Sequence, residues 1–71
     1  MEYVVVEFAE DRGDLIDDNE NGRTNQTLMV EKGTHAFTLS GAADFQPPIR
    51  ELMVEYTAAA DPLKIVFEKI A

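Results

Sequence analysis

The feature that most constrains the fold is a series of short segments in which large apolar side chains occupy every second position. The clearest segments are residues 1–8, 24–31, 34–40, 49–56 and 62–71. Successive side chains of a strand point to opposite faces of a sheet, so this spacing gives each segment one apolar face. No stretch is long and apolar enough at the helical period to form a core helix. The pattern predicts an all-β fold, a small antiparallel β-sandwich of about six to seven short strands.

The length of the chain, 71 residues, predicts a single β-sandwich domain over residues 1–71. A domain of this size buries only about 60% of the surface that its unfolded chain exposes. Because the sequence contains no cysteine, no disulfide or cysteine-ligated metal can add stability. The core must come from the inward-facing side chains of the strands. The period of two predicts that these are Val4, Val6, Phe8, Leu28, Val30, Phe37, Leu39, Leu52, Val54, Leu63, Ile65 and Phe67.

Residues with strong turn preferences predict how the strands connect. Residues 17–22 are all Asp, Asn, Glu or Gly, and the pair Asn21-Gly22 is typical of a hairpin turn. A short loop that ends in Gly joins the next two segments, so residues 26–40 are expected to form an antiparallel hairpin. The segment 41–48 interrupts the strand pattern because its two prolines lack backbone donors. We expect its one large apolar side chain, Phe45, to close one end of the core.

Residues 49–60 carry a competing helical signal. Several of them, three alanines included, are good helix formers. β-branched and aromatic residues in the same segment favour a strand. We expect the strand, because the apolar positions alternate.

The charge of the chain excludes several classes of partner. Fourteen acidic residues against six basic ones give a net charge of −8 at pH 7. Such a field repels phosphate backbones and anionic lipid headgroups, so we expect no nucleic-acid partner and no membrane insertion. Six acids against one base between residues 10 and 20 leave −5 there, which predicts a negative end. No membrane span and no signal peptide is recognisable in the sequence, which therefore assigns no compartment.

The spacing of Asp17, Asn19 and Asn21, followed by Gly, matches the first half of a calcium-binding loop. Side-chain oxygens alternate in such a loop, and Glu20 would supply a further carboxylate. The second half of the pattern is missing, because Leu28 occupies the position of the bidentate Glu. The alternative is a turn whose side chains bond their own backbone. No cofactor is expected other than calcium bound weakly at this loop.

The sequence offers no catalytic set, and we expect no enzymatic activity. His35, the only histidine, is predicted to face the core beside Phe37 as a neutral structural residue bonded to a carbonyl or an acid. Ser40, the only serine, lies on the opposite face of that strand, so the two cannot form a nucleophile–base pair. An enzymatic alternative would need an interface between copies of the chain. Arg50 is expected to pair with Asp44 or with a partner's carboxylate.

A set of glycines and alternating apolar residues lies between residues 22 and 54. Its members are Gly22-Arg23-Thr24, Leu28 and Val30, Gly33-x-His35-x-Phe37-x-Leu39, Phe45, and Leu52-x-Val54. In order and spacing they resemble the G-K-T-P, L-x-L, G-x-H-x-I-x-V, G-Y and V-x-V elements of the PEGA domain. That domain is a small β-sandwich module related in shape to carboxypeptidase-regulatory and transthyretin-like domains. Asn25 stands in place of the family's proline, and the tetrad that names the family is absent. The resemblance implies a non-catalytic accessory module of larger bacterial or archaeal proteins, in a cell-envelope or signalling context.

These observations predict a non-catalytic accessory or protein-interaction module. Its contacts would use exposed edge strands, which pair with a strand of the partner, or the loop of Phe45, Pro47, Pro48 and Arg50. The partner would be another protein, a neighbouring domain of a larger chain, or a second copy of this chain joined through edge strands. The alternative is a calcium-binding β-module that uses the acidic loop 17–22.

Overall fold

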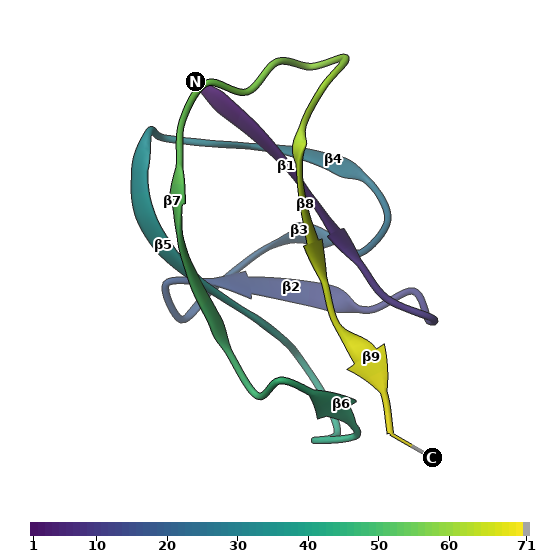
Figure 1. Cartoon of the computed structure of the whole chain (residues 1–71). Helices are drawn as coiled ribbons and strands as arrows, with labels where there is room; N and C mark the ends of the chain where they lie inside the picture. The colour runs from purple at the N-terminus through teal and green to yellow at the C-terminus, as the bar shows by residue number, and fades with distance from the viewer. Residues whose placement is uncertain (71) are drawn as a thin grey trace.

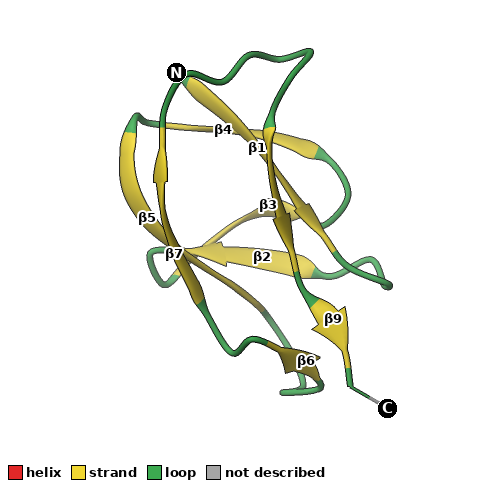
Figure 2. Cartoon of the chain, viewed as in Figure 1, coloured by secondary structure: helices red, strands yellow, loops and turns green. Residues whose placement is uncertain are grey.

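The computed structural model describes residues 1–70, which form strands and loops without a helix in this range (Figure 1). The strands are β1 (Glu2–Glu7), β2 (Gly13–Ile16), β3 (Asn19–Arg23), β4 (Thr27–Val30), β5 (Gly33–Leu39), β6 (Phe45–Gln46), β7 (Arg50–Val54), β8 (Leu63–Val66) and β9 (Glu68–Lys69). Figure 2 shows strands and loops alternating along the chain. The prediction of an all-β fold is confirmed. Ala71, the last residue of the expected final strand, lies outside the described residues.

Two sheets face each other across the core. One has the strand order β4-β1-β8 and the other β3-β2-β5-β7. β1 pairs antiparallel with β4 and parallel with β8, whereas the pairs of the larger sheet are antiparallel. The very short strands β6 and β9 form a ribbon near the C-terminus, at the bottom of Figure 1. The result is a small elongated sandwich with principal extents of 34, 21 and 17 Å.

The core lies between the two sheets and contains the side chains that the alternation predicts to face inward. The buried apolar residues are Val4, Val6, Phe8, Ile16, Val30, Phe37, Leu39, Val54, Ile65 and Phe67. Those partly buried against this set are Leu28, Phe45, Leu52 and Leu63. Phe45 packs edge-to-face on Phe8 and Phe67, with ring centroids 6.2 and 5.6 Å apart. The prediction that Phe45 closes one end of the core is confirmed.

The predicted hairpin over residues 26–40 is wrong. β4 pairs with β1, while β5 pairs with β2 and β7, so the connection at Glu31 and Lys32 crosses from one sheet to the other. Either arrangement turns Val30 and Phe37 toward the core. Alternation therefore predicts which face of a strand is buried, but it does not predict which neighbour the strand pairs with.

The tight turn predicted at Asn21 and Gly22 lies earlier in the chain, at Asp17 and Asp18. Both Asp residues have φ in the left-handed region, 52° and 67°, as a type I′ hairpin turn requires. Asn21 and Gly22 instead belong to β3, where the register with β2 shifts. Gly22 has φ 80°, and a Cβ at this position would overlap Cδ2 of Leu28. Glycine here serves an irregularity of the strand and close packing rather than a turn.

The helical alternative for residues 49–60 is wrong, because β7 occupies the start of this segment and pairs with β5. Val54 is fully buried, and Leu52 is partly buried on the same face, as the alternation predicts. The expected final strand over 62–71 is divided between β8, in the smaller sheet, and β9, in the ribbon. This division brings the end of the described chain close to β6.

Candidate functional site

A surface groove lies at the end of the sandwich where the ribbon of β6 and β9 meets β7 and β8. It has a volume of about 570 Å³, and its lining residues are Gln46, Pro47, Pro48, Arg50, Val66 and Glu68. We call it the Pro-Pro groove. Three residues of the predicted interaction loop, Pro47, Pro48 and Arg50, line it. The fourth, Phe45, packs against the core instead.

Arg50 does not pair with Asp44, and that prediction is wrong. Asp44 is bound by Arg12 and Lys69, which approach it from other parts of the chain. The Nη1 atom of Arg50 donates to the carbonyl oxygen of Val66 at 3.3 Å. Within residues 1–70 the guanidinium has no carboxylate partner, so its charge is available at the groove.

Two free sheet edges border the Pro-Pro groove. β7 is the last strand of the larger sheet and β8 the last of the smaller one, and no other strand within residues 1–70 pairs with their outer sides. The bond from Arg50 to the Val66 carbonyl joins the two strands, so both edges lie on one side of the sandwich. Ile49, Met53 and Val66 expose 51%, 56% and 45% of their surface along these edges. An extended segment can hydrogen-bond to such an edge while its side chains contact apolar surface.

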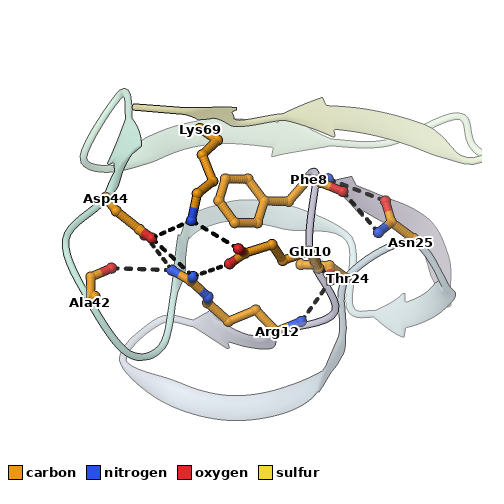
Figure 3. A network of polar contacts seen from close by, with 8 residues as sticks. All are labelled: Phe8, Glu10, Arg12, Thr24, Asn25, Ala42, Asp44 and Lys69. Carbon is orange, nitrogen blue, oxygen red and sulfur yellow. Dashed lines mark hydrogen bonds and ion pairs between the residues drawn. The ribbon is translucent and has the colours of Figure 1, made fainter. Parts of the chain in front are cut away.

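An ionic network joins the loop after β1, the loop before β6, and β9 (Figure 3). Arg12 donates from Nη1 and Nη2 to the two carboxylate oxygens of Asp44, at 2.6 and 3.2 Å. Arg12 also bonds to Glu10 and to the carbonyl oxygen of Ala42. The Nζ atom of Lys69 lies 2.7 Å from Asp44 Oδ2 and 2.8 Å from Glu10 Oε2. Two cations and two carboxylates therefore bind one another.

The network holds its members in their charged forms. Hydrogen bonds from Arg12 and then Lys69 hold the pKa of Asp44 well below its usual range. Lys69 is the main cause of the lowered pKa of Glu10, and the same contacts raise the pKa of both cations. Arg12 also lies over the ring of Phe8, with Cζ 5.0 Å from the ring centroid. Charged groups that are fully paired with one another hold the loops that carry them in place. This arrangement suits a structural role better than a catalytic one.

Thr24 and Asn25 fasten the backbone of the same loop (Figure 3). The Thr24 hydroxyl donates to the Glu10 carbonyl at 2.7 Å and accepts from the Arg12 N–H at 2.9 Å. The Asn25 side chain accepts from the Phe8 N–H at 3.1 Å and donates to the Phe8 carbonyl at 2.9 Å. These bonds satisfy backbone groups between β1 and β2 that no strand pairs.

Three of the four predicted calcium ligands lie around a separate hollow of about 270 Å³. The hollow is lined by Met1, Ile16, Asp17, Asn19, Asn21, Met29, Val30, Glu31 and His35. Glu20 is not among these residues. The carboxylate of Asp17 is engaged on both oxygens, by the Ala36 N–H at 2.9 Å and by His35 at 2.6 Å, and the Asn19 amide donates to the Asp17 carbonyl. Within residues 1–70, no group of three or more His, Asp or Glu side chains is placed to hold a metal ion.

His35 contacts an oxygen acceptor with each ring nitrogen. Nδ1 lies 2.6 Å from Asp17 Oδ2, and Nε2 lies 2.7 Å from the Glu31 carbonyl oxygen. These are the partners expected for a structural histidine. A neutral ring has only one N–H, however, so two acceptors favour the charged ring over the predicted neutral one. Asp17 first and the Glu31 carbonyl second raise the pKa of His35.

The negative charge expected between residues 10 and 20 is partly compensated in the fold. Three of the six acids in this segment contact a cationic or ionisable group from elsewhere, namely Arg23, His35 and Lys69. A fourth, Asp14, is buried. The segment is therefore less negative than its composition predicts.

Sequence reasoning missed the roles of Arg12 and Lys69 and the burial of Asp14. No local pattern indicates that the two cations converge on Asp44, because Lys69 reaches it through the pairing of β6 with β9 and Arg12 from the loop after β1. Asp14 is different, since it precedes Ile16 by two positions and the strand period puts both on one face. That signal was present in the sequence.

No family model, curated protein or solved structure compared with this chain matches it. None of residues 1–70 belongs to a helix long and apolar enough to cross a membrane.

Proposed function

We propose that this chain is a non-catalytic accessory module that binds an extended segment of another protein along β7 and in the Pro-Pro groove. The observation that carries the proposal is the meeting of two unpaired sheet edges with a groove of about 570 Å³. Backbone groups of the bound segment would pair with the edge of β7. Its alternate side chains would enter the groove, because successive side chains of a strand point to opposite faces.

The lining of the groove suits a peptide. Pro47, Pro48 and Val66 supply rigid or exposed apolar surface. Among residues 1–70 the Arg50 side chain makes a single hydrogen bond, to the Val66 carbonyl, and retains further N–H donors, while Glu68 supplies a carboxylate. Binding sites commonly combine apolar surface with a few polar groups that fix the orientation of the ligand.

Charge favours a basic segment as the partner. The chain carries a net charge of −8, so its overall field attracts a basic segment and repels an acidic one. Complementary charge speeds association and selects between partners. A second copy of the chain carries the same −8, so repulsion opposes pairing between two copies.

A PEGA-like identity is part of this proposal. The elements that carry the resemblance fall on or beside β3, β4, β5, β6 and β7, and their members Val30, Phe37, Leu39 and Val54 are buried. These residues stabilise the core. The resemblance therefore supports an accessory module but does not assign a binding site. The proposal includes no catalytic role for the ionic network or for His35.

Selection from a displayed library of random peptides tests the proposal. We expect the selected peptides to be net basic, to alternate apolar residues, and to lose binding to a Val66→Arg variant, which places a cation in the groove. Met29→Arg is the matched control, because Met29 is an exposed apolar residue on β4, the opposite edge of the same sheet. Peptides that bind both variants equally, or that are acidic, would contradict the proposal.

A further inference from the structure

Asp14 is the one Asp or Glu within residues 1–70 that the fold buries. It lies on β2, two positions before Ile16, and both side chains point into the sandwich. Only 1% of its surface is exposed, and neither carboxylate oxygen has a hydrogen-bond partner among the described residues. Such a group is rare, because an ionised carboxylate away from water is costly unless donors surround it.

The surroundings of Asp14 offer no hydrogen-bond partner in the part of the chain that the structure describes. Its neighbour on β5 is Leu39, and the facing sheet turns apolar side chains into the core. The titratable groups on the strands that pair with β2 are Glu20 and Arg23 on β3, both exposed, and His35 on β5, which is bonded elsewhere. None of these groups bonds to the Asp14 carboxyl group.

Burial raises the pKa of Asp14 to about 7, and only the charge of Arg23 opposes this shift. Arg23 directs its Nε atom to Asp11 at 3.1 Å and does not bond to Asp14. An Asp in an unfolded chain has a pKa near about 3.9. Between these two values, the carboxyl group of Asp14 keeps its proton in the folded chain and has lost it in the unfolded chain.

β3 is the edge strand beside this buried group. Within residues 1–70 it pairs with β2 alone, all five of its residues are exposed, and the register between the two strands shifts. Segments with few buried contacts open at a lower free energy than the core does. Loss of β3 from the edge would bring water to β2.

We propose that Asp14 is a pH-sensitive switch in the core of this fold: the closed sandwich holds its carboxyl group protonated, and ionisation releases β3 from β2. Release would free the edge of β2, which carries Leu15 and Ile16, as an additional unpaired strand edge. The switch is independent of the Pro-Pro groove and stands whether or not the groove binds a peptide.

The direction of the pH effect follows from the form that the fold prefers. Because the folded pKa is above the unfolded one, Asp14 does not oppose folding below about pH 4. Between that value and the folded pKa, its destabilising effect grows as the unfolded chain loses the proton first. Above the folded pKa the effect is constant.

Thermal melts of the full chain across about pH 5 to pH 8 test the proposal. Asp14→Asn keeps the shape of the side chain but removes the titratable group. Asp14→Val places an apolar, β-branched side chain at this buried strand position. We expect both to remove at least about 5 °C of the fall in melting temperature that the wild type shows over this range. Asp18→Asn, at an exposed turn position, is the matched control and should keep the full fall.

Two NMR measurements on the wild type keep the test decisive if the variants do not fold. The Asp14 carboxyl carbon should titrate closer to pH 7 than to pH 4, and amide exchange in β3 should accelerate over the same titration, beyond the general rise with pH seen in β5. An Asp14 carboxyl that titrates near its ordinary value of about 3.9 would overturn the proposal. So would an unchanged fall in melting temperature in a folded Asp14→Asn variant.

Discussion

Arg12 and Asp44 form a two-pronged ion pair, with Nη1–Oδ1 and Nη2–Oδ2 distances of 2.6 and 3.2 Å. Two parallel bonds between a guanidinium and a carboxylate are stronger and more directional than one. The pair joins the loop after β1 to the residue before β6, and Lys69 on β9 binds the same carboxylate. The position of Gln46, which lines the Pro-Pro groove, therefore depends on charges outside the groove.

Asp44→Ala is expected to lower the melting temperature more than Asp11→Ala does. Asp44 contacts both Arg12 and Lys69, whereas Asp11 is largely exposed and contacts Arg23. Exposed single pairs contribute little to stability, so the difference between the variants reports the network. Melts at low and high salt measure it, and salt should narrow the gap because it screens charges. An equal or larger loss in Asp11→Ala would contradict this role.

The network also predicts a loss of stability in acid. Because the pKa values of Asp44 and Glu10 are lowered in the folded state, both groups stabilise the fold above the ordinary carboxyl pKa of about 4. That contribution disappears as the pH falls through the folded values. The wild type should therefore lose melting temperature more steeply in acid than Asp44→Ala does. Identical acid limbs in the two proteins would show that Asp44 is not held in its charged form.

The ring of His35 is expected to titrate above its ordinary pKa of about 6.5. A raised folded pKa means that the contribution of His35 to stability is complete below the unfolded value and is lost as the pH rises through the folded one. The ring resonances report this directly, because His35 is the only histidine.

Asp17→Asn provides the control for His35. An Asn at this position can donate to Nδ1, which favours the neutral ring, so the pKa of His35 should fall to the ordinary value or below it. A wild-type pKa at or below about 6.5, or no change in Asp17→Asn, would mean that the pair with Asp17 does not hold the proton.

Gly22→Ala is expected to destabilise the fold by upwards of about 2 kcal/mol, from left-handed backbone strain and overlap with Leu28. Gly41→Ala is the control, because Gly41 has a similar φ of 88° but a Cβ there would meet only ordinary contacts with Arg12, at 3.8 and 3.9 Å. Urea denaturation measures both free energies of unfolding. A smaller cost at Gly22 than at Gly41 would show that Leu28 does not pack against β3 as described.

Calcium is expected to raise the melting temperature no more than magnesium does. Asp17 is already engaged by His35 and by the Ala36 N–H, so a cation must compete with existing bonds. Melts with about 1 mM of either ion at matched ionic strength make the comparison. A calcium-specific rise that Asn21→Ala abolishes would contradict this expectation and support the calcium-binding interpretation.

Alternation along the strands predicted the core because burial depends on which face a side chain takes. Val4 and Val6, predicted to share an inward face, are both fully buried. The partners of the strands could not be predicted in the same way. The parallel pairing of Val4 with Leu63 joins opposite ends of the chain, and no local pattern encodes it. The prediction of a hairpin over residues 26–40 failed for the same reason. The same side chains are buried whether β4 pairs with β5 or with β1.

The sequence predicted those features of the candidate site that depend on residues close together in the chain. Pro47 and Pro48 indicated a rigid loop, and this loop lines the groove. The predicted ion pair between Asp44 and Arg50 was wrong because the prediction considered only groups that are close in sequence. Lys69 reaches Asp44 through the ribbon of β6 and β9, a contact that depends on the assembled fold.

The most direct test of the central claim is an NMR titration with two synthetic peptides, one of alternating Lys and Val and one of alternating Glu and Val. Both can add a strand to a free edge, but only the first complements the net charge of −8. We predict that the Lys-Val peptide shifts the amide resonances of β7, of β8 and of Gln46, and that the Glu-Val peptide does not. Shifts confined to β3 and β4, or equal shifts from both peptides, would contradict the proposal that this module binds a basic extended segment at β7.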